Sequence, residues 1–168
     1  MKYLLGLFAF VVLFSCNSQN VKNAQNSKSQ YSTIEYKTTP CFGFCPVFAM
    51  TINPDRTAVL EAEHFNFTKT PSKDEFSKPR EGTFKATIKE ADYNKLVSLL
   101  NGLDVKNLNE NYGQKNVSDL SSSNLTVNFA DGTSKKVEDY GKRGSEKLIE
   151  VYKFFEDLKL NQQWIKVN

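Results

Sequence analysis

The chain has 168 residues, with 22 basic and 19 acidic side chains and a net charge of +3 at pH 7. Nucleic-acid binding needs a concentrated basic face, and because the sequence contains no such run of Lys and Arg we exclude nucleic acid as a partner. Behind a leader and a spacer, about 135 residues remain, the usual size of one domain.

The first 16 residues have the layout of a secretion signal. Lys2 carries a positive charge, and an apolar stretch of about 13 residues follows, which is shorter than the roughly 20 that a spanning helix needs. The stretch ends in "LFSC", which resembles the lipobox of bacterial lipoproteins, with Leu13 and Ser15 ahead of the lipidated cysteine. We therefore predict a lipoprotein signal peptide over residues 1–16 and lipid attachment at Cys16, whose acyl chains anchor the mature protein to a membrane.

Residues 17–32 are rich in Asn, Ser, Gln and Lys and have few apolar side chains. Such a segment cannot bury enough surface to offset the entropy lost on ordering, so we predict a flexible tether. Asn17 follows the lipidated cysteine, where an Asp would resemble an inner-membrane retention signal of some bacteria. We expect the protein in the bacterial cell envelope, on the outer membrane and facing the periplasm.

The single domain is predicted over residues 33–168, and its hydrophobic periodicity gives a coarse map. Runs of alternating or apolar residues at 47–52 and 58–67 flank the turn formers "NPDRT" and predict a hairpin. The alternation in "TFKATI" predicts a third strand, and "KEADYNKLVSLLNGL" places apolar residues at helical spacing. A second hairpin is predicted from "NLTVNFADGTSKKVEDY", and a last helix from the N-cap Ser145 to about Leu158.

These elements predict an α+β fold. The turns between strands are too short for parallel crossovers, so the strands are expected to pair in an antiparallel sheet. Two amphipathic helices then need one apolar surface to cover. We predict an antiparallel sheet with two helices packed on one face, in the order β-β-β-α-β-β-α.

Two cysteines, Cys41 and Cys45, lie in the stretch "TTPCFGFCPVF". In an extended strand their Cα atoms would be about 13 Å apart, beyond the roughly 7 Å that a disulfide spans. Gly43 lies midway and two prolines flank the pair, which favours a turn. In an oxidising compartment we favour a structural disulfide. Thiol exchange and metal binding at these two cysteines are the alternatives, although zinc wants four ligands and His64 is the one histidine of the chain.

The motif "CFGFCPVFAMTI", followed by "NYGQKNVSDLSSSNLTV" and "VEDYGKRGSEKLIEV", resembles an uncharacterised bacterial family, a domain of unknown function. Members open with Cys-Phe-Gly-x-Cys-Pro and often carry lipoprotein signals. The resemblance covers about residues 38–158 and implies a fold and a location without an activity. In the family pattern a Thr precedes Asp119 and a Pro follows Leu120, whereas this chain has Ser118 and Ser121.

No catalytic constellation is apparent, since the single histidine has no nucleophile at a recognisable spacing and no phosphate-binding loop occurs. We therefore expect a non-catalytic binding module without a cofactor or metal, whose partner is an envelope protein, a peptide or a small ligand. The segment 109–123 has about 15 residues with little periodicity, a length that tends to be functional. With the turn at 41–45 it forms the candidate binding surface, in which we single out Phe42, Tyr112 and Asp119.

Overall fold

The structure is a computed structural model that describes residues 29–167. The predicted signal peptide, the lipidation of Cys16 and most of the predicted tether lie outside these residues. Within 29–167, neither helix is long and apolar enough to cross a membrane.

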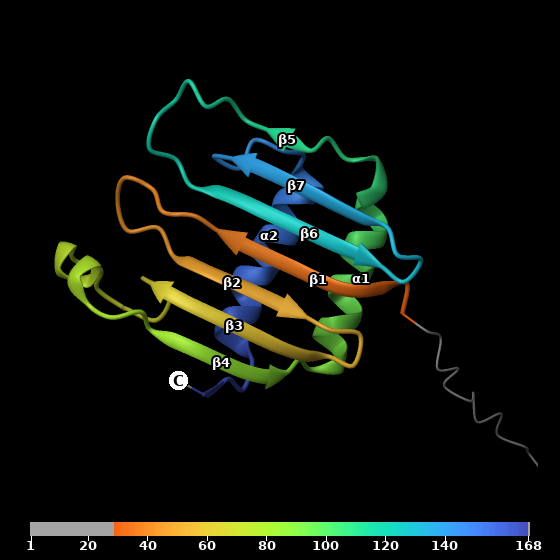
Figure 1. Cartoon of the computed structure of the whole chain (residues 1–168), viewed down its shortest axis with the longest axis horizontal. Coiled ribbons are helices and arrows are strands. Elements are labelled where there is room, and N and C mark those ends of the chain that lie inside the picture. Colours follow the sequence, from red (N-terminus) through yellow and green to blue (C-terminus); the bar gives the residue numbers. More distant parts are fainter. Residues whose placement is uncertain (1–28, 168) are drawn as a thin grey trace, which may run out of the picture.

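One sheet of eight strands organises the domain, in the order β5-β7-β6-β1-β2-β3-β4-β8 (Figure 1). β5 pairs with β7 in parallel, and the other neighbouring strands are antiparallel. The strands are β1 (Tyr31–Thr38), β2 (Val47–Ile52), β3 (Thr57–His64), β4 (Gly82–Thr87), β5 (Asn111–Tyr112), β6 (Ser122–Phe129), β7 (Ser134–Tyr140) and β8 (Ile165–Lys166). The helices are α1 (Glu90–Leu103) and α2 (Glu146–Asn161), with short 3-10 turns η1 (Lys73–Ser77) and η2 (Val105–Asn107).

Both α-helices cover the same face of the sheet, which confirms the predicted α+β architecture (Figure 1). The inward side chains of the strands alternate with polar ones, so a single apolar face meets the apolar stripes of α1 and α2. The opposite face carries mostly charged, Thr and Asn side chains and stays open. The largest fully buried side chains include Tyr36, Phe48, Met50, Leu60, Leu96, Tyr152 and Phe155.

The sheet contains three strands beyond the five that were predicted. β1 was not predicted because a bulge between Tyr31 and Thr33 shifts its alternation, so a period of two holds only over the short stretch from Ile34 to Thr38. β1 begins at Tyr31, inside the segment predicted as tether. β5 and β8 pair over two residues each, too few to produce a periodic signal. β3 ends at His64, three residues before the predicted end, because Phe65 has a positive φ of 61°.

The predicted cap of the second helix is confirmed. Ser145 precedes α2, and its hydroxyl accepts a hydrogen bond from the backbone N–H of Leu148 at 3.3 Å. α1 ends at Leu103, and the next residue, Asp104, adopts the left-handed conformation with φ of 52°. Both helices begin within a residue or two of the predicted positions, and α2 continues to Asn161, three residues beyond its predicted end.

A buried carboxylate holds the connection between β7 and α2. Asp139 is fully buried, and its oxygens accept hydrogen bonds from the backbone N–H groups of Arg143 at 2.6 Å and Gly144 at 2.9 Å. Nearby, Tyr36 stacks against Tyr152 with ring centroids 5.4 Å apart. Burial raises the pKa of both phenols, so these rings act as neutral core side chains.

We expect Asp139→Ala to lower the free energy of unfolding by about 2 to 4 kcal/mol, because two backbone N–H groups lose the buried carboxylate that accepts their hydrogen bonds. Urea denaturation followed by circular dichroism measures this loss. Asp157→Ala, an exposed position on α2, is the control and should change stability by less than about 0.5 kcal/mol. Equal effects of the two substitutions would contradict the structural role of Asp139.

Candidate functional site

Three connections meet at one end of the sheet, which we call the disulfide end (Figure 1). They are the β1–β2 turn (39–46), the β3–β4 connection (65–81) and the β5–β6 connection (113–121). The first described residue, Ser29, precedes β1 at the opposite end of that strand. The disulfide end therefore lies across the sheet from the point where the described chain begins.

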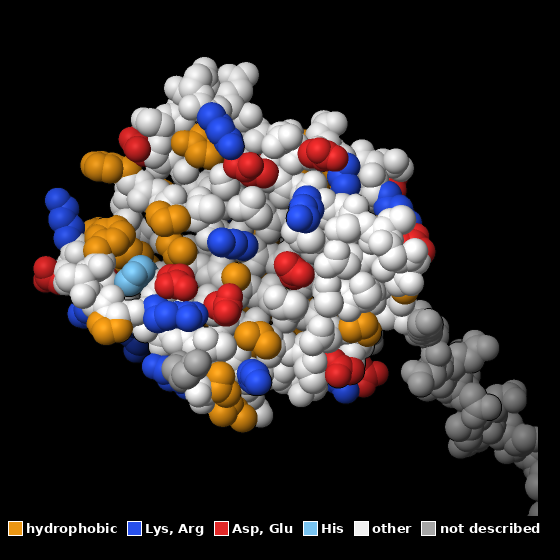
Figure 2. Space-filling view, viewed as in Figure 1, with side chains coloured by type: hydrophobic (Ala, Val, Ile, Leu, Met, Phe, Trp, Pro, Cys, Tyr) orange, Lys and Arg blue, Asp and Glu red, His pale blue; other side chains and the backbone are white. Residues whose placement is uncertain are grey.

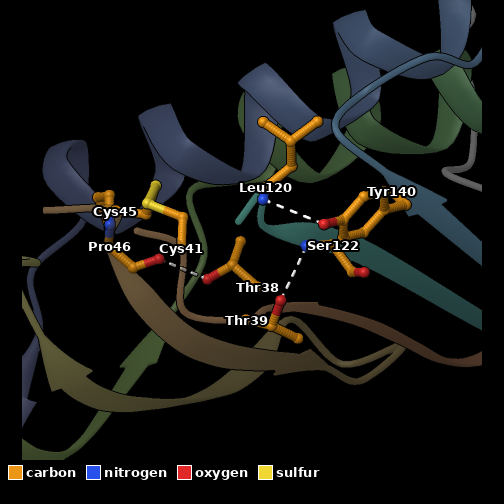
Figure 3. Close-up of a disulfide and its surroundings, with 8 residues drawn as sticks. All are labelled: Thr38, Thr39, Cys41, Cys45, Pro46, Leu120, Ser122 and Tyr140. Carbon is orange, nitrogen blue, oxygen red and sulfur yellow. Dashed lines mark hydrogen bonds between the residues drawn. A yellow bond between two sulfur atoms is a disulfide. The ribbon is translucent and has the colours of Figure 1, made fainter. Parts of the chain in front are cut away.

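The β1–β2 turn contains the predicted disulfide between Cys41 and Cys45, whose Cα atoms are 5.8 Å apart. Gly43 supplies the turn with a φ of 145°, a conformation that residues with a Cβ rarely adopt. The base of the turn is tied by Thr38, whose hydroxyl donates to the carbonyl of Pro46 at 2.7 Å (Figure 3). The disulfide and this hydrogen bond together fix the shape of the turn.

The structure brings the β1–β2 turn against the β5–β6 connection. The N–H of Phe42 donates to the carbonyl of Asp119 at 3.0 Å. The N–H of Ser122 donates to the hydroxyl of Thr39 at 2.8 Å, and that of Leu120 donates to the Tyr140 hydroxyl at 3.1 Å (Figure 3). The two segments singled out from the sequence thus form one continuous surface.

The three predicted surface residues differ in exposure. Phe42 is 87% exposed, and Asp119 is exposed with its carboxylate accepting from Ser118 at 2.9 Å. Tyr112 is half-buried against the core, and its hydroxyl accepts from the N–H of Asn109 at 3.2 Å. Phe42 and Asp119 are therefore accessible to a partner, whereas Tyr112 chiefly supports the connection. Their role in binding stays a prediction.

The β3–β4 connection also contributes to this surface, which was not predicted from the sequence. Phe65 is buried there and packs between two partly exposed rings, Phe44 at 5.4 Å and Phe76 at 4.9 Å between centroids. We call Phe44, Phe65 and Phe76 the aromatic cluster. A usable signal was the length of this connection, about 17 residues where hairpin loops usually have 2–5.

A hollow of about 270 Å³ lies between the disulfide and the aromatic cluster. Its lining comes from Pro40, Cys41, Gly43, Cys45, Val47, Glu63, His64 and Phe76. The His64 ring packs 6.1 Å from Phe65 and 6.4 Å from Phe76, as part of the aromatic surface. Figure 2 shows hydrophobic side chains gathered at this end, while charged side chains are scattered over the middle of the open face.

A second hollow of about 340 Å³ continues from the first along β2. The two share Pro40, Val47 and Glu63 in their linings. We call the combined depression the β2 groove. Its far end is lined by Lys37, Ala49 and Glu61 on the open face of the sheet. The groove therefore joins an apolar end at the disulfide to a charged end above β2.

Buried polar contacts support the groove from beneath. The amide of Asn66 donates to the carbonyl of Val47 at 2.8 Å, and the Lys159 ammonium donates to the Asn66 side-chain oxygen at 3.2 Å. Lys159 is 4% exposed and lies 4.5 Å from the centroid of the Phe48 ring. Burial lowers the pKa of the Lys159 ammonium. These contacts fix the β3–β4 connection to β2 and α2.

The surroundings of Cys41 and Cys45 bear on the two alternatives to a structural disulfide, thiol exchange and metal binding. A strand, β2, follows Cys45, whereas redox-active thiols are commonly activated at a helix N-terminus. Among residues 29–167, no three His, Cys, Asp or Glu side chains are grouped to hold a metal ion. The disulfide end thus presents an exposed surface with a mostly apolar hollow beside the disulfide.

Replacing both cysteines, Cys41→Ser with Cys45→Ser, should lower the free energy of unfolding by about 2 kcal/mol, because a loop this short constrains the unfolded chain only modestly. Urea denaturation measures the loss, and non-reducing peptide mapping of the wild type should find the Cys41–Cys45 link. Two thiols that alkylate freely in protein purified without reductant would contradict the disulfide.

Comparison with known proteins places the chain in a family. The profile described as Domain of unknown function (DUF6438) matches residues 32–159, from β1 to the last turn of α2. The match includes the disulfide turn and all three connections of the disulfide end. A search of curated proteins finds no match. The chain belongs to the DUF6438 family of domains of unknown function.

Proposed function

We propose that this protein is a lipid-anchored lipoprotein of the bacterial cell envelope whose domain acts by binding, without catalysis, through the disulfide end. The observation that carries the proposal is the exposure of aromatic side chains there: Phe42 is 87%, Phe76 52% and Phe44 43% exposed. Exposed apolar side chains that cluster, rather than occur singly, mark interaction sites. Phe42 and Phe44 lie within the disulfide turn and Phe76 packs against Phe65, so their display costs a partner little ordering entropy.

The direction of β1 supports the presentation of this surface. β1 has 8 residues and runs from the end where the described chain begins to the disulfide turn, a span of about 25 Å. Because the tether enters at Ser29, the disulfide end is the end of the domain farther from the point of attachment. On an outer membrane facing the periplasm, this end would meet envelope proteins, peptides or small ligands.

Thiol–disulfide exchange at Cys41 and Cys45 is the second candidate function, favoured by the place of both cysteines in the wall of the hollow. The two proposals predict different effects of replacing both Cys41 and Cys45 with serine. Exchange is abolished when both cysteines become serine, whereas binding through exposed rings is weakened only as far as the turn loosens. Envelope complementation by the Cys41→Ser, Cys45→Ser chain separates them.

The anchor is tested at Cys16. Wild-type protein recovered from membranes should have an intact mass that includes acyl chains, and the Cys16→Ala chain should lack them and leave the membrane fraction, since the acyl chains supply the membrane affinity. A wild-type chain recovered free of acyl groups and beginning at another residue would overturn this part of the proposal.

The binding surface is tested by a photo-crosslinking amino acid at position 42 in intact cells. Because Phe42 is the most exposed ring of the disulfide end, it should capture a defined partner, which mass spectrometry then identifies. The matched control carries the crosslinker at Leu160, 68% exposed on α2, and should not capture that partner. A Phe76→Ser substitution should reduce the capture from position 42. Capture of nothing from position 42, with full complementation by a Phe42→Ser, Phe76→Ser chain, would reject the surface.

A further inference from the structure

The charged end of the β2 groove carries opposite charges on its two walls. Lys37 on β1, Ala49 on β2 and Glu61 on β3 occupy one row of the sheet, since Lys37 pairs with Ala49 and Ala49 with Glu61. Neighbouring strands are about 4.8 Å apart, so the Cα atoms of Lys37 and Glu61 are separated by about 10 Å. The charged side chains of Lys37 and Glu61 thus lie on either side of the small Ala49 side chain.

Among residues 29–167, neither Lys37 nor Glu61 forms an ion pair within the domain. Glu63, further along the same wall, lies 3.6 Å from Arg80. The groove therefore keeps a positive wall on β1 and a negative wall on β3, both lining the same hollow.

The other end of the groove is mostly apolar. Pro40, Val47, Phe76 and the disulfide line it together with Glu63 and His64, and its volume is about 270 Å³. It shares Pro40, Val47 and Glu63 with the hollow that contains the charged row. A ligand that fills both ends must combine one negative group, one positive group and a large apolar group. Ligand sites commonly pair an apolar hollow with a few polar groups that fix orientation.

We propose that the β2 groove binds an α-amino acid unit with free termini and a large apolar side chain. The carboxylate lies against Lys37, the ammonium against Glu61, and the side chain enters the hollow beside Phe76. A ligand of one sign would leave the facing wall unpaired, and a purely apolar ligand would leave the charged row empty. Free amino acids and short peptides share this chemistry. The inference rests on the proposed function, since it assigns a ligand class to the same end of the domain.

Because the groove is open to water, the two ion contacts are screened and the affinity is modest. We expect a Kd on the order of 1 mM for a free amino acid. The test uses the full mature chain with Cys16→Ala and follows amide shifts by NMR. The probes are L-phenylalanine, its N-acetyl form without the ammonium, its amide without the carboxylate, and glycine without the side chain.

Phenylalanine should shift amides of residues 37–49 and 61–64, and each blocked probe and glycine should bind at least about five-fold more weakly, since each loses one of three contacts. Phenylalanyl-glycine distinguishes a peptide ligand from a free amino acid. If it binds more tightly than phenylalanine, the ligand is a peptide; if it binds more weakly, the ligand is a free amino acid. Equal binding of phenylalanine and both blocked forms would overturn the proposal.

Matched variants test which wall of the groove binds which charged group of the ligand. Lys37→Met should make phenylalanine bind no better than its amide, and Glu61→Gln should make it bind no better than its N-acetyl form. Glu35→Gln and Lys85→Met change charges on the same open face outside the groove and should leave binding unchanged. If no probe binds while position 42 still captures a partner, this inference fails and the proposed function stands; if neither occurs, both fail.

Discussion

The pairing of β1 with both β2 and β6 is the constraint on which the rest of the structure depends. β1 comes first in the domain but lies at the centre of the sheet, where it pairs with β6 from Tyr31 opposite Phe129 to Thr38 opposite Ser123, with one bulge near its start. It joins the meander β2–β3–β4 to the hairpin β6–β7, which otherwise have no strand in common. Its Tyr36 also stacks on Tyr152 and Phe155, so one strand connects both halves of the sheet to α2.

The central position of β1 also creates the disulfide end. Because β1 ends beside the start of β6, Thr39 forms hydrogen bonds with Ser122 at the start of β6, and Phe42 donates to Asp119 in the β5–β6 connection. The turn that carries Cys41 and Cys45 therefore rests on the most extensively paired part of the sheet. Binding residues on loops are precise when a rigid scaffold positions the loops, and here the scaffold is the middle of an eight-stranded sheet.

The open face of the sheet supplies the charged end of the β2 groove. Alternation sends one side of each strand to the helices and leaves the other in water, where it must be polar. Rows of Lys, Glu, Thr and Asn result, and the small Ala49 forms a low point among them. The groove exists because this low point meets the hollow under the disulfide turn. The family assignment adds no activity, and a fold shared by a family does not specify chemistry.

Local patterns in the sequence determined both helices, the two hairpins, the cap at Ser145 and the possibility of a Cys41–Cys45 bridge, because each depends on residues a few positions apart. The tertiary structure decided the place of β1, whose bulge shortens its regular alternation, and the contacts of Phe65 with Phe44 and Phe76. It also placed Lys37 opposite Glu61 across β2. These contacts join residues far apart along the chain, and periodicity records which face a residue takes but not which strand will lie beside it.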